Sequence, residues 1–496
     1  MLRVLQVASE AFPLVKTGGL ADVVGALPQA LLNCDVDARL LLPGFEPVLS
    51  ALRSPRRVST FLAAASGAEI ELLCGELPSM HGLKAYVLEC AALYQRAGGP
   101  YSNPQGAPWP DNHRRFAPLA WASLALAQGA DASWKPEVVH AHDWHAGLAP
   151  AALALAGRPA ASVMTIHNLA YQGLFPAQTF VDLQLPRQAW SVQGCEFYGQ
   201  VSFLKAGLHF ADVVSTVSPT YAREICQPEQ GCGLDGVLRA RPGGVRGILN
   251  GVDDSLWNPE VDPALPQRFS IDKLAGKAAC KAALQEQLQL NRDPAALLFG
   301  VVSRFTEQKG LHLVLQTLPE LLQRGGQLVV LGSGDADLES GFIQAARQHP
   351  GQVAVCVAHD EPLSHRIFGA SDVVLVPSRF EPCGLTQLYA MAYGALPLVH
   401  RVGGLADTVE DVSLEALEEG SATGFVFHEH SRDQMAAAVR RAHVLHARPD
   451  LWRSVQRQAM SRRFDWGRAA LAYRALYQEA QDAQKAQSRA QAAKLA

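Results

Sequence analysis

The sequence predicts an α/β protein built from two domains, each a parallel β-sheet that helices cover on both faces. Three observations support this fold class. The chain has 496 residues, more than one ordinary hydrophobic core organises. Short apolar runs alternate with helix-like stretches, a pattern typical of parallel sheets. The alternation restarts at about residue 240, which indicates a second domain.

The N-terminal domain is predicted to cover residues 1–243. It begins with an apolar strand at residues 2–8, and apolar residues at helical spacing follow over 20–31. Residues 94–114 are rich in Pro, Gly, Asn and Tyr, which is typical of a long surface loop. Further strands are expected at residues 38–42, 83–89, 137–141, 161–166 and 212–217.

The C-terminal domain is predicted to cover residues 244–465. The Pro-rich residues 259–266 are expected to be a connecting segment. The tail from Ala480 is rich in Ala, Gln and Lys, which predicts a helix with a frayed end. Strands are expected at residues 245–249, 297–302, 327–331, 353–357, 373–376 and 397–399.

The composition limits which kinds of molecule the protein is expected to bind and where in the cell it is expected to be. Lys and Arg total 43 against 47 Asp and Glu, so no excess of positive charge favours nucleic acid or a membrane surface. No apolar run approaches the ~18 to 20 residues of a membrane span. The nine cysteines include no Cys-x-x-Cys pair, which favours a reducing compartment, and the N-terminus is predicted to be a strand rather than a signal peptide. We therefore expect a cytoplasmic protein.

The most informative stretch follows the apolar run at residues 373–376. A polar turn leads into the helix formers of residues 387–392, and the N–H groups of Gly384, Leu385 and Thr386 are expected at the helix start, where they favour a phosphate. Glu381 lies just before this turn and can accept a hydrogen bond from a sugar hydroxyl. A nucleotide sugar has both groups; the alternative is a solvated loop acid beside a turn glycine.

Other unusual polar residues also follow predicted strands. Because ligands of open parallel sheets bind at the carboxyl ends of the strands, we expect these residues to line one cleft between the two domains. Arg304 and Lys309 could neutralise a departing diphosphate there, although both could instead be solvated cations. The residues that follow strands are Lys16, 140–145, 167–168, 250–251, 303–304, Lys309, Glu381 and 403–404.

A five-residue sequence occurs twice. Gly-Gly-Leu-Ala-Asp stands at residues 18–22 and again at 403–407, each time after an apolar strand and before a helix-like run. The two glycines would let the backbone approach a ligand, and Lys16 would add a charge beside the first copy. A structural turn before a helix is the alternative interpretation.

The histidines at residues 140, 142 and 145 suggest a second hypothesis. With Asp143 they have a spacing that metal ligands can have, so a zinc-dependent hydrolase is an alternative. Strand alternation instead predicts that His140 lies in the core while Asp143 and His145 face the cleft. His167, at the end of another strand, is expected either in the core or in the cleft.

Taken together, the motifs resemble the family of bacterial glycogen synthases and plant starch synthases, retaining glycosyltransferases that use ADP-glucose. The resemblance implies a GT-B fold: two Rossmann-like, doubly wound parallel-sheet domains, with a C-terminal helix over residues 466–496 that crosses back to the first. The matching segments are residues 16–23, 140–148, 165–173, 218–222, 250–253, 303–310, 377–387 and 403–408.

The resemblance also implies the activity and the residues that perform it. Glucose is transferred from ADP-glucose to the nonreducing end of an α-1,4-glucan with retention of configuration, without a metal or other cofactor. Lys16, Arg304 and Lys309 would hold the diphosphate. The implied catalytic residues are Glu381, His167, Asp143, Arg304 and Lys309. The implied substrate-binding residues are Lys16, Gly18, Gly19, Asn250, Cys383, Gly384, Leu385 and Thr386.

Two positions differ from related enzymes. Position 389 is Tyr where many retaining enzymes of this fold have a second Glu, and His359 stands where bacterial relatives often have a Tyr near the adenine. A related enzyme that uses UDP-glucose or another acceptor is therefore an alternative. For the mechanism we expect attack from the face that the leaving group departs from, because the sequence identifies no glycosidase-like pair of carboxylates.

Overall fold

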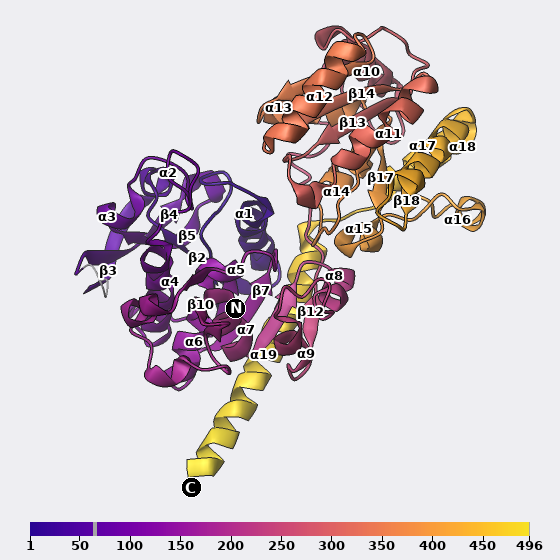
Figure 1. Ribbon diagram of the computed structural model, residues 1–496. Coiled ribbons are helices and arrows are strands. Elements are labelled where there is room, and N and C mark those ends of the chain that lie inside the picture. The colour runs from indigo at the N-terminus through magenta and orange to yellow at the C-terminus, as the bar shows by residue number, and fades with distance from the viewer. Residues whose placement is uncertain (63–66, 496) are drawn as a thin grey trace. The chain divides into compact units, whose positions relative to one another are not determined.

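The computed structural model describes residues 1–62 and 67–495, and they form two compact units. The first unit comprises Met1–Gly251 with Trp466–Ala496, and the second comprises Val252–Asp465. Each unit has its own sheet, in which most strands are parallel (Figure 1). Each also has its own apolar core. The last helix of the chain therefore belongs with the N-terminal sheet.

The sheet of the first unit has the order β12-β11-β7-β6-β1-β2-β5-β4-β3. The strands from β12 to β5 pair in parallel, and β3 and β4 add an antiparallel hairpin at one edge. The strands are β1 (Leu2–Val7), β2 (Val36–Pro43), β3 (Arg53–Leu62), β4 (Glu69–Leu77), β5 (Leu83–Glu89), β6 (Val138–His142), β7 (Ala161–Ile166), β11 (Val213–Thr216) and β12 (Val245–Gly247). A small separate sheet contains β8 (Leu174–Pro176), β9 (Glu196–Phe197) and β10 (Gln200–Ser202).

Helices cover both faces of this sheet because successive strand residues point to opposite sides. Val4 of β1 packs in the core that α19 closes, whereas Leu5 packs in the core on the other side. The expected loop at 94–114 is found between α3 and α4. The helices are α1 (Gly19–Leu32), α2 (Glu46–Ala51), α3 (Ala91–Tyr94), α4 (Asn112–Ala127), α5 (Asp143–Ala146), α6 (Leu148–Leu155), α7 (Phe203–Phe210), α8 (Pro219–Glu224), α9 (Asp235–Arg239) and α19 (Trp466–Leu495).

The second unit has a sheet of parallel strands in the order β15-β14-β13-β16-β17-β18. The strands are β13 (Leu298–Val302), β14 (Gln327–Gly332), β15 (Val353–Val357), β16 (Val373–Val376), β17 (Leu396–His400) and β18 (Phe425–Phe427). The helices are α10 (Ala275–Gln287), α11 (His312–Gln323), α12 (Ala336–Gln348), α13 (Glu361–Ala370), α14 (Thr386–Ala392), α15 (Gly403–Thr408), α16 (Leu414–Glu419), α17 (Arg432–His446) and α18 (Pro449–Ser461).

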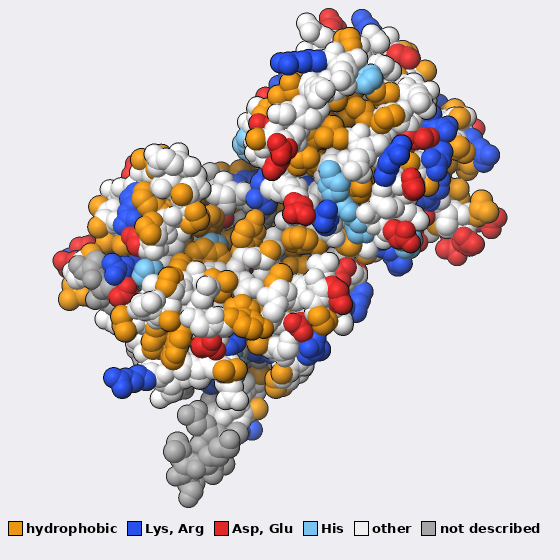
Figure 2. Space-filling view, viewed as in Figure 1, with side chains coloured by type: hydrophobic (Ala, Val, Ile, Leu, Met, Phe, Trp, Pro, Cys, Tyr) orange, Lys and Arg blue, Asp and Glu red, His pale blue; other side chains and the backbone are white. Residues whose placement is uncertain are grey.

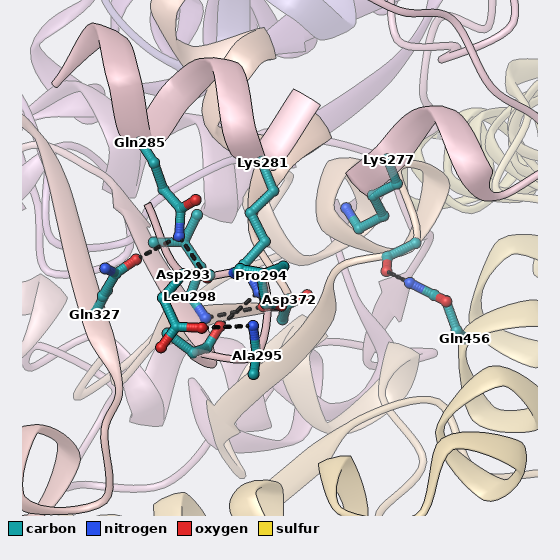
Figure 3. A network of polar contacts seen from close by, with 12 residues as sticks. Lys277, Lys281, Gln285, Asp293, Pro294, Ala295, Leu298, Gln327, Asp372 and Gln456 are labelled. Atoms are coloured by element: carbon teal, nitrogen blue, oxygen red, sulfur yellow. Dashed lines mark hydrogen bonds and ion pairs between the residues drawn. The ribbon is translucent and has the colours of Figure 1, made fainter. Parts of the chain in front are cut away.

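Side chains of helix α10 form polar contacts with residues at the amino ends of strands in this second sheet (Figure 3). Lys281 forms an ion pair of 2.7 Å with Asp372, and the same carboxylate accepts the backbone N–H of Leu298. Gln285 donates to the side chain of Gln327 over 2.8 Å. These contacts lie at the ends of β13, β14 and β16 opposite to the loops that carry the candidate site residues.

The structure corrects the expected position of one strand. Residues 245–249 were predicted to begin the second domain, but β12 pairs with β11 of the first sheet, Val245 opposite Val214. The division between the units accordingly follows Gly251 rather than residue 243. A short apolar run looks the same in either sheet, so the sequence pattern alone could not assign it.

Candidate functional site

In the second unit, Glu381 and Lys309 form a nearly buried ion pair. Lys309 ends the short 3-10 helix Glu307–Lys309, and its Nζ lies 2.6 Å from Glu381 Oε2. The Ser378 hydroxyl donates to the same oxygen over 2.8 Å. Glu381 is only 6% exposed, so its carboxylate has little water around it and depends on these two partners.

The turn after Glu381 takes a conformation that requires glycine. Gly384 has φ +72°, and a Cβ there would lie 2.4 Å from the Gln387 side chain. Gln387 donates to the carbonyl oxygens of Cys383 and Gly384 and so holds the turn at the start of α14. The turn thus lies where it was predicted, between β16 and α14, with Leu385 and Thr386 at the helix start.

Two histidines, which the sequence analysis did not select, hold the backbone before Glu381. His400 shares a hydrogen bond of 2.8 Å with the carbonyl oxygen of Ser378, and His430 shares one of 2.9 Å with that of Pro377. Burial lowers the pKa of both rings. The only sequence signal was that His400 ends an apolar strand. Among the predicted cations, Arg304 is exposed just after β13.

In the first unit, Asp143 and His167 are joined at the ends of β6 and β7. Asp143 Oδ1 accepts the backbone N–H of His167 over 2.7 Å. Asp143 has φ +54°, an uncommon conformation for a residue other than glycine, and burial raises its pKa to about 7. Burial lowers the pKa of His167 to about 3, so this ring is neutral at pH 7.

The histidine cluster does not have the arrangement of a metal site. Both ring nitrogens of His140 and of His142 share hydrogen bonds with protein side chains. His145 instead stacks on Tyr101, with ring centroids 4.5 Å apart. Among the described residues no group of His, Cys, Asp and Glu side chains is placed to hold a metal ion. The metal-binding alternative therefore has no support in this structure.

Strand alternation predicted His140 correctly and His145 wrongly. His140 is fully buried in the core, as expected. His145 was expected to face a cleft, but it is 6% exposed and packs among aromatic rings. The reason is that β6 ends at His142 and α5 begins at Asp143, so the period of two no longer applies.

The remaining N-terminal residues surround the start of α1 and the end of β12. Lys16 forms an ion pair of 2.8 Å with Asp22 and keeps part of its side chain exposed. A Cβ added at Gly18 would meet nothing within 4 Å, and Gly19 is the first residue of α1. Asn250 is buried, and its Oδ1 has no hydrogen-bond partner among the described residues.

The two departures from related enzymes lie in different surroundings. Tyr389 stacks on Trp257 with ring centroids 3.8 Å apart, and Trp257 also stacks on His365 at 3.9 Å. Tyr389, a residue of α14, is thus partly buried and packs against the core of the second unit. His359 is exposed just before α13, so it remains accessible to a ligand.

The structure places the predicted residues in two sets. Those of the first unit are Lys16, Gly18, Gly19, Asp143, His167 and Asn250, and those of the second are Arg304, Lys309, Glu381, Cys383, Gly384, Leu385 and Thr386.

Acidic and basic side chains are interspersed on the face shown in Figure 2. No described helix has the length and apolar character to cross a membrane.

Comparison with known proteins covers almost the whole chain. Residues 3–240 match the starch synthase catalytic domain, and residues 283–450 match the glycosyl transferases group 1. The glycogen synthase of Pectobacterium carotovorum is 52% identical over 96% of this chain and 99% of its own length. That of Erwinia tasmaniensis is 54% identical, with the same coverage of both chains.

A solved structure has the same fold. The catalytic domain of starch synthase IV from Arabidopsis thaliana, bound to ADP and acarbose, superposes with a TM-score of 0.86 at 30% identity. The superposition covers 97% of this chain and 99% of that one. It confirms the predicted fold class, a GT-B protein with two parallel-sheet domains.

Proposed function

Because this chain belongs to the glycogen synthase family, we propose that it transfers glucose from ADP-glucose to the nonreducing end of an α-1,4-glucan, with retention of configuration. The observation that carries this proposal is the similarity to glycogen synthases over nearly the full length of both chains. We propose that the reaction takes place in the cytoplasm and needs no metal ion.

The second unit supplies the groups that stabilise the leaving diphosphate. Arg304 and Lys309 provide positive charge, and the N–H groups of Gly384, Leu385 and Thr386 provide hydrogen-bond donors at the start of α14. Lys309 pairs with Glu381. When the sugar nucleotide binds, Lys309 can share its charge between Glu381 and a phosphate oxygen, and Glu381 can accept a sugar hydroxyl.

The first unit supplies the groups around the sugar. Neutral His167 and the unpartnered oxygen of Asn250 can hydrogen-bond to hydroxyl groups of the glucose. Asp143 lies beside His167, and the open space at Gly18 allows a phosphate to approach the backbone there, with Lys16 nearby and Gly19 at the start of α1.

The chemical step exchanges one bond at the anomeric carbon for another. The bond between this carbon and the phosphate oxygen breaks, and the acceptor hydroxyl oxygen forms the new bond from the same face. Its proton passes to the departing phosphate of ADP. The cations and amide groups stabilise the charge on the diphosphate throughout, and the exclusion of water suppresses hydrolysis of the donor.

The test measures incorporation of labelled glucose into glycogen from ADP-glucose and, in parallel, from UDP-glucose, with and without a chelator. We expect transfer from ADP-glucose that survives the chelator. The variant Glu381→Gln should lose roughly 100-fold or more of kcat, because a buried group at the site loses its charge and its pairing with Lys309. Equal turnover of both donors, or a Glu381→Gln variant as active as the parent, would contradict the proposal.

A further inference from the structure

A chain of buried hydrogen bonds runs from His167 through the first sheet to the C-terminal helix α19. His167 is linked to His142 over 2.9 Å, and His142 to Gln6 of β1 over 2.6 Å. The Gln6 amide donates to the hydroxyl of Tyr477 over 2.8 Å, and this hydroxyl is 3.0 Å from His140. Four of these side chains are fully buried, and His167, at the end that reaches the candidate site, is 9% exposed.

A series of polar side chains is tolerated in an apolar core only when every member is hydrogen-bonded. An unpaired buried polar group destabilises the folded state, whereas a satisfied network fixes the orientation of each member. Beyond His140 the chain continues to Thr165 over 2.6 Å and from there to Ser215 over 2.6 Å. The members come from β1, β6, β7, β11 and α19, elements spread over the whole sequence.

The positions of the protons follow from the Gln6 amide. Its oxygen accepts from His142 Nε2, so His142 Nδ1 carries no proton and accepts from His167 Nε2. This leaves Nδ1 of His167 unprotonated, and no hydrogen bond to a described residue uses it. Burial lowers the pKa of all three histidines, so each ring is neutral and carries one N–H.

We propose that Gln6, His142 and Tyr477 are positioning residues that hold His167 as an acceptor, with Nδ1 presented to a hydroxyl group of the donor sugar. To reverse the chain, the Gln6 amide would have to rotate by half a turn, and each neutral histidine would have to change its tautomer. Tyr477 opposes this rotation because it accepts from the amide nitrogen and donates to His140. A residue of the last helix thus determines the tautomer of a site residue. The inference rests on the role proposed above for His167.

The test is a double-mutant cycle between Tyr477→Phe and His167→Ala, read as kcat/KM for ADP-glucose with saturating glycogen. We expect Tyr477→Phe to lower kcat/KM roughly 10-fold in the parent, because small displacements at a site have effects of this size. In the His167→Ala background the same change should alter kcat/KM less than about twofold, since the residue it positions is gone. Tyr473→Phe is the matched control. Tyr473 is a buried tyrosine one turn earlier on α19, and its hydroxyl is not a member of the chain; this change should leave kcat/KM unaltered in both backgrounds.

A spectroscopic readout separates positioning from a purely structural role. The ¹⁵N chemical shifts of histidine distinguish protonated from unprotonated ring nitrogens, and the His167 signals are those missing from His167→Ala. We expect Nε2 protonated and Nδ1 unprotonated in the parent, and a mixture of tautomers in Tyr477→Phe. If Tyr477→Phe fails to fold, Gln6→Met replaces it in the cycle, because it removes both amide hydrogen bonds at similar volume.

The outcomes distinguish the two proposals. If His167→Ala keeps the kcat/KM of the parent, the role proposed for His167 is wrong and the inference falls with it. If His167→Ala is impaired but Tyr477→Phe reduces activity equally in both backgrounds, only the inference is overturned. A proton on Nδ1 of His167 in the parent overturns it as well.

Discussion

Asp143 combines burial, a positive φ and a raised pKa in one residue. Its carboxylate accepts two backbone N–H groups, from His167 and from Asn168, which favour the ionised form, but burial outweighs them. The resulting pKa of about 7 means that protonated and ionised forms coexist near neutral pH. Side chains with such values are common where chemistry takes place.

The pKa of Asp143 predicts how stability changes with pH. The folded value of about 7 exceeds the ordinary value of 3.8, so ionisation costs stability as the pH rises from 4 to 7. An asparagine side chain at this position would not titrate, and asparagine tolerates positive φ. We expect Asp143→Asn to gain unfolding free energy relative to the parent over this range, by up to roughly 4 kcal/mol at pH 8. Denaturant unfolding at several pH values measures this difference, and a constant difference would contradict the prediction. Transfer activity should fall in the same variant.

At the scale of single residues, the sequence predicted which residues belong to the candidate site better than it predicted which side chains they pair with. Glu381 and Lys309 were both selected because each follows a strand, but they are 72 residues apart and their direct pairing has no local signal. His145 was misplaced because one residue decides whether strand or helix periodicity applies. His400 and His430 were missed because their role is to bind backbone carbonyl groups, which leaves no motif.

At the scale of elements, the repeated Gly-Gly-Leu-Ala-Asp sequence has two different surroundings. At its second copy the backbone is tightly packed: Gly403 has φ +44°, and a Cβ there would lie 1.9 Å from the carbonyl oxygen of Glu381. A Cβ at Gly404 would lie 2.1 Å from the carbonyl oxygen of Cys383. At the first copy Gly18 has open space. The same five residues thus serve packing in one unit and access to the backbone in the other.

This contrast predicts opposite effects of alanine. Gly403→Ala should lower both the melting temperature and the activity, because its Cβ collides with the backbone that carries Glu381. Gly18→Ala should keep the melting temperature within about 2 °C and raise KM for ADP-glucose, because the methyl group occupies the space beside Lys16. Thermal scans and initial rates of both variants measure these effects. A destabilised Gly18→Ala, or an unaffected Gly403→Ala, would contradict this difference between the two glycines.

The ion pair between Lys281 and Asp372, at the amino ends of the second sheet, leads to a prediction that concerns stability alone. Lys281→Met leaves Asp372 with the backbone N–H of Leu298 but without its cation. Removing one partner of a buried pair typically costs about 3 to 5 kcal/mol. We expect a loss near the lower value, since both side chains keep slight exposure, with kcat of the folded enzyme unchanged. Urea unfolding measures the loss of stability, and initial rates measure kcat. A lower kcat under conditions where the variant is fully folded would contradict the expectation that kcat is unchanged.

Elements were predictable in type but not always in their pairing. The parallel strands of both sheets were found because buried strands have continuous apolar runs. The hairpin β3–β4 was not predicted, since β3 is largely exposed and includes Arg53, Arg56 and Arg57. β12 was assigned to the wrong sheet, because strand order is decided by contacts between segments far apart in the sequence.

At the scale of the whole molecule, α19 completes the first unit. Its residues from Trp466 to Ala480 include a buried row that packs on α1 and β7, whereas the described residues beyond Ala480 are mostly exposed. We expect a chain ending at residue 480 to keep the melting temperature of the parent to within a few degrees. A chain ending at residue 465 should expose this core. We expect its first unit to show no cooperative unfolding transition and the chain to aggregate. Calorimetry of both truncations measures this, and a stable, cooperatively folded 1–465 chain would contradict it.

The position of α19 also bears on how the protein is made. β1 lies in the middle of the first sheet, yet the helix that covers it is synthesised only after the whole second unit. The second unit is uninterrupted in sequence and can fold as soon as it has been synthesised, but the first has to wait until α19 has followed it. Until then its apolar face is uncovered in the nascent chain, so we expect chaperones that bind emerging polypeptides to engage the N-terminal half for longer than the C-terminal half.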